Sequence, residues 1–598
     1  MPHHQDNSPR DAVARLLRTM GQRLEVRRHG AFGPGGAPAR GEERTSEVAS
    51  PPRRTTLDAT IRPTGSGRYR RLAWAPGEQH VLRDELGADP SPDRTKTRRS
   101  VLYVAHHTDS HICDAQSPAR LTGGEAFGWV NPGADAGHRP QETCTAQVLD
   151  SLVRATNAVR VSPISGAEMA CCLQSGDNTD NRTLAEATWF RAVLDGRPVT
   201  PNTGLAGSYQ GVQRSGWRTV WHPDRPGFDL RQRQGYPFLP GFLDAAVARF
   251  RPAGLEVPWL TVFGNHDSLF QGTFGEGRGL PIHRLERLLV GASRSPVTAA
   301  ALVRAIGVVS AWGDDPRNWR RLAFGPGVVP VVADPESRRP LALDEYLAAL
   351  LTDDGGPGPL GHGFTAEHLM TGTSWWSRPE GDRTQIIGLD TCHHRAGDDG
   401  RLGPTQTAWL EAELQRHHTR WQEPTGRWID GDGVDRLVVV VSHHNSRTMN
   451  NVGDDPHDPG PATTGPALVE LLSRYPNVVL WLNGHSHEHR IDCHRRSGPG
   501  CGWWEVNTAS AIDFGQQGRT IEVFDNGDGT LSIAVTVLDH QADPSVPHRD
   551  PTGWTPARLA SISRELAAND DRWFDPMSLL GRREDRNVEL PLANPLLR

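Results

Sequence analysis

Residues 169–180, MACCLQSGDNTD, contain the pattern from which the fold is predicted. An apolar run from Met169 to Leu173 passes almost directly into the polar cluster Gly176 to Asp180. A short apolar run that ends in glycine and polar residues is typical of a buried strand followed by a functional loop. The same arrangement recurs in four other segments: Val101 to Ala105, Trp259 to Phe263, Leu437 to Val441 and Val478 to Leu482.

Segments with helical spacing of apolar residues lie between these predicted strands. Ala146 to Val161 keeps this spacing, and Trp409, Leu410 and Leu414 keep it later in the chain. Strands that alternate with helices predict an α/β fold with a sheet that is at least partly parallel. Because the loops at the carboxyl ends of parallel strands converge, we expect a ligand crevice there.

The C-terminal part of the chain predicts a hairpin and a helix. The segments Ile521 to Phe524 and Leu531 to Val537 flank residues 525–529, whose Asn-Gly and Asp-Gly pairs favour a tight turn. Thr555 and Pro556 predict the start of a helix, because these residue types suit the cap and the first helical position.

Length and composition predict one catalytic core with large additions. The chain has 598 residues, against a typical domain of about 150, and its 63 Gly and 47 Pro residues indicate many loops. We expect residues 1–55, rich in Arg, Pro and Gly, to be mostly disordered. We expect residues 56–545 to form the catalytic domain, with insertions near 185–255 and 270–380, and residues 546–598 to form a helical tail.

Charge and hydropathy disfavour some partners. The chain has 65 basic and 71 acidic residues and a net charge of -6, so nucleic acid is disfavoured as a partner. No apolar run reaches the ~20 residues that span a membrane, and Arg27-Arg28 lacks the apolar region of an export signal, so we expect a cytoplasmic protein. Lys96 is the single lysine, a usage that favours a bacterial origin. Of the seven cysteines, only Cys493 and Cys501 are placed for a local disulfide.

The five predicted strand ends carry side chains that bind divalent metals. The clusters are Asp109-Ser110-His111, Gly176 to Asp180, Gly264-Asn265-His266-Asp267, Ser442-His443-His444 and Asn483 to His487. Two neighbouring divalent ions need a shared carboxylate, further ligands on both sides and an open position for water and substrate. Each cluster alone is more often a turn or a solvated pair, but the ordered set favours a metal site.

The ordered set resembles the calcineurin-like metallophosphoesterase superfamily, whose signature runs D-x-H, G-D-x-x-D, G-N-H-D/E, H and G-H-x-H. The resemblance covers roughly residues 100–540. It implies a metallophosphoesterase-type four-layer αββα sandwich, here with long insertions. It also implies that one metal is held by Asp109, His111 and His487 and a second by Asn265, His443 and His485, with Asp177 bridging the two.

The resemblance also assigns roles to two residues beside the ligands. It implies that His266 stabilises charge on the phosphoryl oxygens or protonates the leaving group. It further implies that Asp267 fixes the tautomer of His266. Both residues are therefore candidate catalytic residues.

This sequence departs from parts of the superfamily at three positions. Purple acid phosphatases have a glycine in place of His111 and a tyrosine ligand in place of Asp180, so we expect this chain to lie outside that subclass. Asn445 stands where many relatives have proline, which leaves a choice between His443 and His444 as the ligand. The apolar run that precedes them favours His443.

The predicted function is metal-dependent hydrolysis of a phosphate ester, mono- or diester, by a hydroxide that bridges two divalent metals. Mixed Asp, Asn and His ligands suit Mn, Fe and Zn, and the sequence does not choose among these metals. We expect a small phosphorylated substrate. Three alternatives stay open: a non-catalytic metal-binding or scaffold protein on the same fold, a nuclease of the same superfamily, and a hydrolase of non-phosphate bonds.

Overall fold

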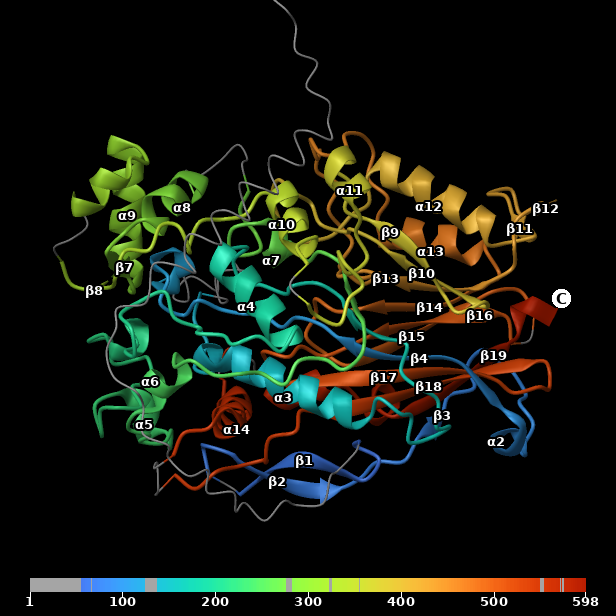
Figure 1. Ribbon diagram of the computed structural model, residues 1–598, viewed down its shortest axis with the longest axis horizontal. Helices are drawn as coiled ribbons and strands as arrows, with labels where there is room; N and C mark the ends of the chain where they lie inside the picture. The colour runs from blue at the N-terminus through green and yellow to red at the C-terminus, as the bar shows by residue number, and fades with distance from the viewer. Residues whose placement is uncertain are drawn as a thin grey trace, which may run out of the picture.

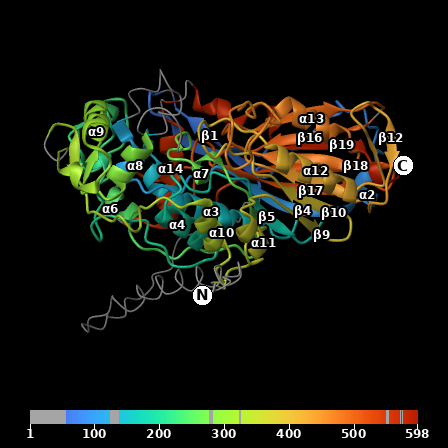
Figure 2. The same cartoon turned by 90° about the horizontal axis from the view of Figure 1, so that it is seen from above.

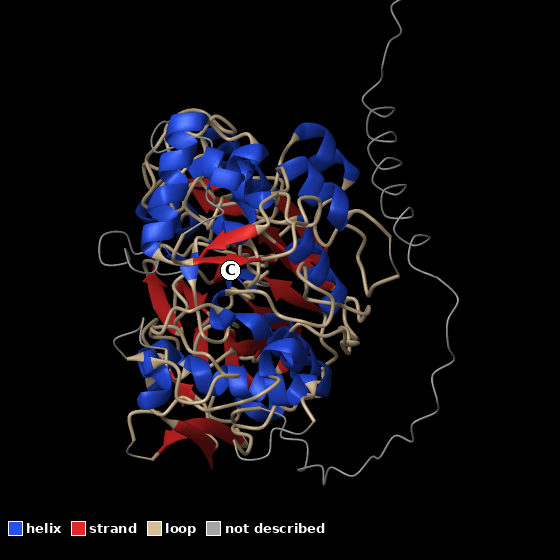
Figure 3. Cartoon of the chain, turned by 90° about the vertical axis from the view of Figure 1, so that its left-hand side faces the viewer, coloured by secondary structure: helices blue, strands red, loops and turns tan. Residues whose placement is uncertain are grey.

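Two β-sheets packed face to face form the centre of the protein. The computed structural model describes residues 55–65, 67–123, 137–275, 282–321, 325–353, 355–498, 500–548, 553–570, 572 and 575–597. Helices cover the outer faces of the sheets, so that the layers follow the order helix, sheet, sheet, helix (Figure 1 and Figure 3). The predicted α/β fold with a four-layer sandwich is confirmed. The expected disorder of residues 1–55 falls, apart from residue 55, outside the described residues.

The first sheet has seven strands in the order β3-β19-β18-β17-β4-β5-β6. They are β3 (Val81–Leu82), β4 (Arg99–His107), β5 (Cys171–Gln174), β6 (Trp259–Thr261), β17 (Gln517–Asp525), β18 (Thr530–Asp539) and β19 (Val588–Ala593). The strands β4, β5 and β6 are parallel to one another. The strands β17 and β18 form the predicted antiparallel hairpin, which is longer than the sequence pattern indicated.

The second sheet has six strands in the order β15-β16-β14-β13-β10-β9. They are β9 (Trp376–Glu380), β10 (Thr384–Gly388), β13 (Leu437–Val441), β14 (Val478–Asn483), β15 (Arg490–Arg495) and β16 (Gly502–Asn507). The four central strands β10, β13, β14 and β16 are parallel, and the two edge strands are antiparallel to their neighbours. All five segments predicted as strands before polar clusters are therefore strands, distributed over both sheets.

The outer helix layers contain the helices predicted from apolar spacing. α3 (Thr145–Ala158), α4 (Leu184–Leu194) and α14 (Pro556–Ala567) lie on the first sheet, and α12 (Pro404–Arg416) and α13 (Gly465–Ser473) lie on the second (Figure 1). The shorter or peripheral helices are α2 (Arg94–Thr97), α5 (Leu230–Arg233), α6 (Phe242–Ala246), α7 (Asn265–Ser268), α8 (Ile282–Val290), α9 (Ala299–Trp312), α10 (Leu343–Leu350) and α11 (Ala366–Thr371). As predicted, the Thr555 hydroxyl caps α14, accepting a hydrogen bond from the Arg558 backbone N–H.

Apolar side chains from both sheets fill the space between them. Val104 and Ile521 of the first sheet belong to the same buried cluster as Val439 and Leu480 of the second. Val438, the neighbour of Val439, points to the opposite face and packs in a separate cluster with α12 and α13. A central parallel strand buried on both faces explains why residues 437–441 are apolar without interruption. Burying each of these side chains contributes about 1.5–3 kcal/mol.

The two predicted insertions contain core elements as well as peripheral ones. Within residues 185–255, α4 packs Phe190 and Val193 into the main core. Within residues 270–380, β9 forms an edge of the second sheet. By contrast, α6, α8 and α9 gather at one end of the molecule (Figure 1 and Figure 2). The division of the chain into the domains expected from the sequence stays a prediction.

The sequence led us to expect a helical C-terminal segment, but the segment also contains a strand. After α14, residues 588–593 form β19, which pairs antiparallel with β18. Val588, Leu590 and Leu592 alternate along the strand and are buried, which is the pattern of a strand with one face in the core. The prediction of a purely helical tail is therefore wrong for this strand.

Two further expectations concern cysteines and membranes. No disulfide joins Cys493 and Cys501 in the part of the chain that the structure describes. Across the part of the chain that the structure describes, no helix has both the length and the apolar character needed to cross a bilayer.

Candidate metal centre

The seven predicted ligands lie on five loops that leave the carboxyl ends of parallel strands. Asp109 and His111 follow β4, Asp177 follows β5, Asn265 begins α7 just after β6, His443 follows β13, and His485 and His487 follow β14. Three of these strands belong to the first sheet and two to the second. Because the two sheets face each other, their loops meet at one end of the sandwich and bring the seven side chains together.

Five of these residues have a left-handed backbone conformation. The φ angles are 51° for Asp109, 40° for His111, 47° for Asp177, 70° for His485 and 57° for His487. Positive φ is uncommon for residues other than glycine and costs roughly 1–3 kcal/mol when the surroundings impose it. Such strain concentrates at functional sites, because the surrounding fold holds the side chains in a required arrangement.

Two glycines allow the loops to approach one another closely. A Cβ atom on Gly264 would lie 2.2 Å from the backbone nitrogen of Asp177. A Cβ atom on Gly484 would lie 2.0 Å from Oγ1 of Thr108 and 2.5 Å from Oδ2 of Asp109. These separations exclude any side chain, so both glycines are required for the contact between the loops.

Asp109, His111 and His487 face one another and form a first group. Nε2 of His487 lies 3.3 Å from Nε2 of His111 and 3.3 Å from Oδ1 of Asp109. All three side chains are buried. Oδ1 of Asp109 is enclosed and faces Nε2 of His487, so a charged imidazole or a cation in its place is needed to stabilise this buried oxygen.

Asp177 lies between this first group and a second group formed by Asn265, His443 and His485. Oδ2 of Asp177 is 3.5 Å from Nε2 of His111 and 3.3 Å from Nε2 of His443. Nε2 of His443 is also 3.0 Å from Oδ1 of Asn265 and 3.2 Å from Nδ1 of His485. One carboxylate therefore contacts histidines of both groups.

Fixed acceptors orient three of the histidine rings. Nδ1 of His111 lies 3.2 Å from the Asp180 carboxylate, Nδ1 of His487 lies 2.7 Å from the Asp513 carboxylate, and Nδ1 of His443 lies 3.0 Å from the Ser175 carbonyl. Because carbonyls and ionised carboxylates only accept, each Nδ1 carries a proton. In the neutral ring, Nε2 then directs its lone pair toward the centre, which is the arrangement of a metal-binding histidine.

Carboxylates determine the charge of two histidines. Burial alone would lower the pKa of His443, but Asp177 and Asp109 raise that pKa to about 9. Burial also opposes the charged form of His487, whose pKa is nevertheless raised to about 9 by Asp109 and Asp513. In a metal-free centre both imidazoles therefore hold an extra proton at neutral pH, and a cation must displace these protons in order to bind.

The geometry favours His443 over His444 as a ligand. Nδ1 of His444 lies 2.8 Å from the Thr391 hydroxyl, and its Nε2 lies 2.8 Å from the Asp398 carbonyl oxygen. Both ring nitrogens of His444 are thus engaged, whereas Nε2 of His443 faces Asp177.

His266 lies beside the first group, but its ring is oriented differently from the sequence-based expectation. Its ring centroid is 4.5 Å from that of His111, and its Nδ1 atom lies 2.7 Å from the backbone carbonyl oxygen of Asp180. Asp267 instead accepts hydrogen bonds from backbone N–H groups, including that of Gly264, and from the Tyr346 hydroxyl. The prediction that Asp267 fixes the tautomer of His266 is therefore wrong, because the Asp267 carboxylate turns away to hold the loops together.

A buried network of arginines supports the carboxylates that orient the histidines. Asp180 forms ion pairs with Arg120 and Arg139, and Asp513 forms one with Arg572 at 2.8 Å. The sequence analysis identified none of Arg120, Arg139, Asp513 and Arg572. They lie outside the five clusters, and no local pattern marks them.

The donor set and its spacing fit divalent cations. Two ligands bound about 2.0–2.2 Å from one ion, at angles near 90–110°, lie about 3–3.5 Å apart. Most of the facing ligand atoms are separated by such distances, from 3.0 Å to 3.5 Å. The ligand atoms of Asp109, His111 and His487, and those of Asp109, Asp177 and His443, lie within 4.8 Å of one another, so each set could hold an ion.

Comparisons with known proteins add little to this geometry. No family model and no curated protein matches the chain. Among solved structures, a dimetal phosphatase from Danio rerio is similar at 10% identity and a TM-score of 0.28, over 74% of this chain and 100% of that one. A purple acid phosphatase from yellow lupin (Lupinus luteus) seeds is similar at 10% identity and a TM-score of 0.27, over 78% of this chain and 54% of that one. At TM-scores this low the likeness carries no weight for function.

Proposed function

We propose that this protein hydrolyses phosphate esters with the help of two divalent metal ions. The observation that carries the proposal is the set of ring nitrogens and carboxylate oxygens that face one another inside the protein. Nε2 of His111 and Nε2 of His487 are 3.3 Å apart, while the Nδ1 atom of each ring already faces a carboxylate. Two such nitrogens repel each other unless a proton or a cation lies between them.

The ligand assignment follows from the two groups. We assign Asp109, His111 and His487 to one ion, Asn265, His443 and His485 to the other, and Asp177 to both. The contacts of Asp177 with histidines on both sides support its shared role. Mn, Fe and Zn all suit this mixture of oxygen and imidazole donors.

Bound divalent ions would lower the pKa of a water molecule and hold the phosphoryl oxygens of a substrate. The chain itself orients the ligands through Asp180, Asp513 and the Ser175 carbonyl, so that little rearrangement is needed when a substrate arrives. Buried surroundings strengthen each of these electrostatic interactions.

His266 is proposed to carry a proton between the attacking water and the leaving oxygen. Burial, together with Arg139 and His487, lowers the pKa of His266 to about 4, so the ring is neutral near pH 7. Its Nδ1 proton is directed at the Asp180 carbonyl, which leaves Nε2 to accept a proton. The ring must therefore take a proton at Nε2 before it can return one to the leaving group.

The substrate is proposed to be a small phosphate ester. The metal centre is proposed to differ from the tyrosinate-iron centre of purple acid phosphatases. The position of their tyrosine is occupied by Asp180, which is paired with Arg120 and Arg139 and contacts Nδ1 of His111. The net charge of -6 disfavours a nuclease. A scaffold role is disfavoured because it gives no reason for five strained backbone positions to converge on one cluster.

The test is a panel of phosphate mono- and diesters, assayed with Mn²⁺, Zn²⁺ and Fe²⁺ and compared with carboxyl esters. We expect metal-dependent turnover of a phosphate ester by the wild-type protein. Asp177→Asn should abolish this turnover, and His266→Ala should lower it by about 10²–10⁴-fold. Undiminished activity in both variants, or carboxyl-ester activity alone, would contradict the proposal.

A further inference from the structure

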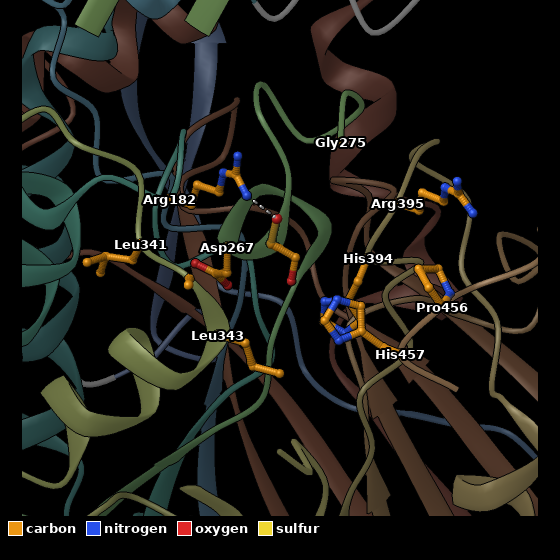
Figure 4. A pocket seen from close by; sticks show the side chains of 11 residues that line it. Arg182, Asp267, Gly275, Leu341, Leu343, His394, Arg395, Pro456 and His457 are labelled. Carbon is orange, nitrogen blue, oxygen red and sulfur yellow. Dashed lines mark hydrogen bonds between the residues drawn. The ribbon is translucent and has the colours of Figure 1, made fainter. Parts of the chain in front are cut away.

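A cavity of about 380 Å³ lies behind α7, the short helix that carries Asn265 and His266. It is lined by Arg182, Asp267, Ser268, Gly275, Leu341, Ala342, Leu343, His394, Arg395, Pro456 and His457. Figure 4 shows His394 and His457 side by side, across the cavity from Leu341 and Asp267. None of these residues except Asp267 belongs to the metal centre described above.

Two buried carboxylates hold the histidine side of this cavity in place. Oδ2 of Asp390 lies 2.8 Å from Nε2 of the His394 ring. Asp455 accepts hydrogen bonds from the backbone N–H of His394 at 3.0 Å and of His457 at 3.0 Å. Both carboxylates are buried, so they fix the two loops relative to each other before any ligand binds.

The cavity presents hydrogen-bond donors rather than acceptors. Asp390 raises the pKa of His394 above its ordinary value although burial opposes this shift, so the imidazole favours its charged form. Nδ1 of His394 then carries a proton and has no partner within the described residues. Arg182, which also borders the cavity, is close enough to His394 to oppose its charge. Arg182 already donates to the Glu286 carboxylate at 2.9 Å and to the Ser268 carbonyl at 3.1 Å, and its buried Nε is left without a partner within the described residues.

The acidic group that lines the cavity does not cancel this character. The oxygens of Asp267 already accept hydrogen bonds from the backbone N–H groups of Asn178, Thr179 and Gly264. Arg395, by contrast, has no side-chain hydrogen bond or ion pair in the part of the chain that the structure describes, and it lies at the same cavity. Its guanidinium is free to turn toward a bound anion.

We propose that this cavity binds a phosphate-type anion, recognised by His394, Arg395 and Arg182. The anion has two sources that share this chemistry. It is either a free anion or a second phosphate on a substrate whose first phosphate lies in the metal centre. The second alternative rests on the proposed function. The cavity adjoins α7, so either source would be held next to the helix that carries His266.

The first experiment measures binding of inorganic phosphate by calorimetry to the full-length Asp177→Asn protein in the presence of a chelator. This background weakens the metal centre, which would otherwise bind phosphate itself. We expect binding that is weakened about tenfold or more by His394→Gln and by Arg395→Gln, because each removes a charged donor. Arg378→Gln removes an exposed arginine on β9 outside the cavity and should leave binding unchanged.

The Arg395 variant keeps the test decisive if His394→Gln fails to fold, since Arg395 has no partner to lose. Absence of phosphate binding in the Asp177→Asn protein, or equal binding in the Arg395 and Arg378 variants, would overturn the proposal. Turnover of an aryl phosphate by the wild-type protein tests the proposed function separately. If the wild-type protein shows no turnover while phosphate binding is retained, the proposed function is overturned and the anion site is still supported.

A second comparison distinguishes the two sources. The kcat/KM values for a substrate with one phosphate and for the same substrate with a second phosphate are measured in the Arg395→Gln and Arg378→Gln proteins. A preference for the second phosphate that is lost only in the Arg395 variant assigns the anion to the substrate. Equal ratios in both variants, with phosphate binding dependent on Arg395, assign the cavity to a free anion.

Discussion

Replacing Asp513 by Asn is expected to weaken metal binding through His487. Oδ2 of Asp513 lies 2.7 Å from Nδ1 of His487, and the carboxylate keeps the ring proton on Nδ1. The amide of Asn can turn its NH₂ group toward Nδ1, which moves the ring proton to Nε2. Nε2 lies 3.3 Å from both Asp109 and His111, so that proton would occupy the place of the metal bond.

The expected loss is about 10–100-fold in metal affinity, or about 1.4–2.7 kcal/mol. Affinity is measured by competition with a chromogenic chelator, using Mn²⁺ and Zn²⁺. Asp570→Asn is the matched control, because Asp570 is also buried and also pairs with Arg572, at 2.7 Å, but contacts no histidine among the described residues. If the Asp513 and Asp570 variants bind metal with equal affinity, the orientation of His487 by Asp513 is refuted.

Three other variants test separate parts of the structure. Gly484→Ala would place a methyl carbon 2.0 Å from Oγ1 of Thr108 in the loop after β4. We expect the free energy of unfolding in urea to fall by about 1–3 kcal/mol and the metal content to decrease. Wild-type values for both would contradict the close approach of the loops. Arg120→Met leaves Asp180 with one fewer buried cation, and unfolding free energy should fall by about 3–5 kcal/mol; a change under about 1 kcal/mol would refute the buried pair. His394 has a pKa raised above 6.5 beside Asp390, so its stabilisation is complete below pH 6.5 and is lost as pH rises through the raised value. Destabilisation by His394→Gln should therefore be larger below pH 6.5 than in alkaline solution, and the reverse order would contradict this pairing.

The sequence predicted the five loops of the candidate metal centre because the information is local there. Each apolar run ends in a polar cluster, and both features are visible within about ten residues of sequence. The choice of His443 over His444 rested on the apolar run before them and stays a prediction, which the engagement of both His444 nitrogens elsewhere supports.

The residues that orient the ligands could not be predicted in this way. Asp513 contacts His487 from a loop 26 positions further along the chain, and Arg572 reaches Asp513 across 59 positions. Such pairs depend on how the sheets and the C-terminal segment pack, which no short pattern records. The role of Asp267 was misassigned for the same reason, because its partner Tyr346 lies 79 positions away on α10.

The strand β19 shows a similar limit in the fold. Its residues alternate as a strand should, but the preceding helix and the distance from the hairpin gave no sign that they add to the first sheet. Its partner β18 belongs to a hairpin that was predicted, because the Asn-Gly and Asp-Gly pairs of the turn mark it directly.

The central claim is that Asp177 is shared by two metal ions. The most direct measurement is the metal content of the full-length protein by mass spectrometry after loading with Mn²⁺ and removal of excess metal. We expect about two ions per chain in the wild-type protein and at most one in Asp177→Asn, because the shared carboxylate is lost. A wild-type protein that retains no metal, or an Asp177→Asn protein that still retains two ions, would contradict the account.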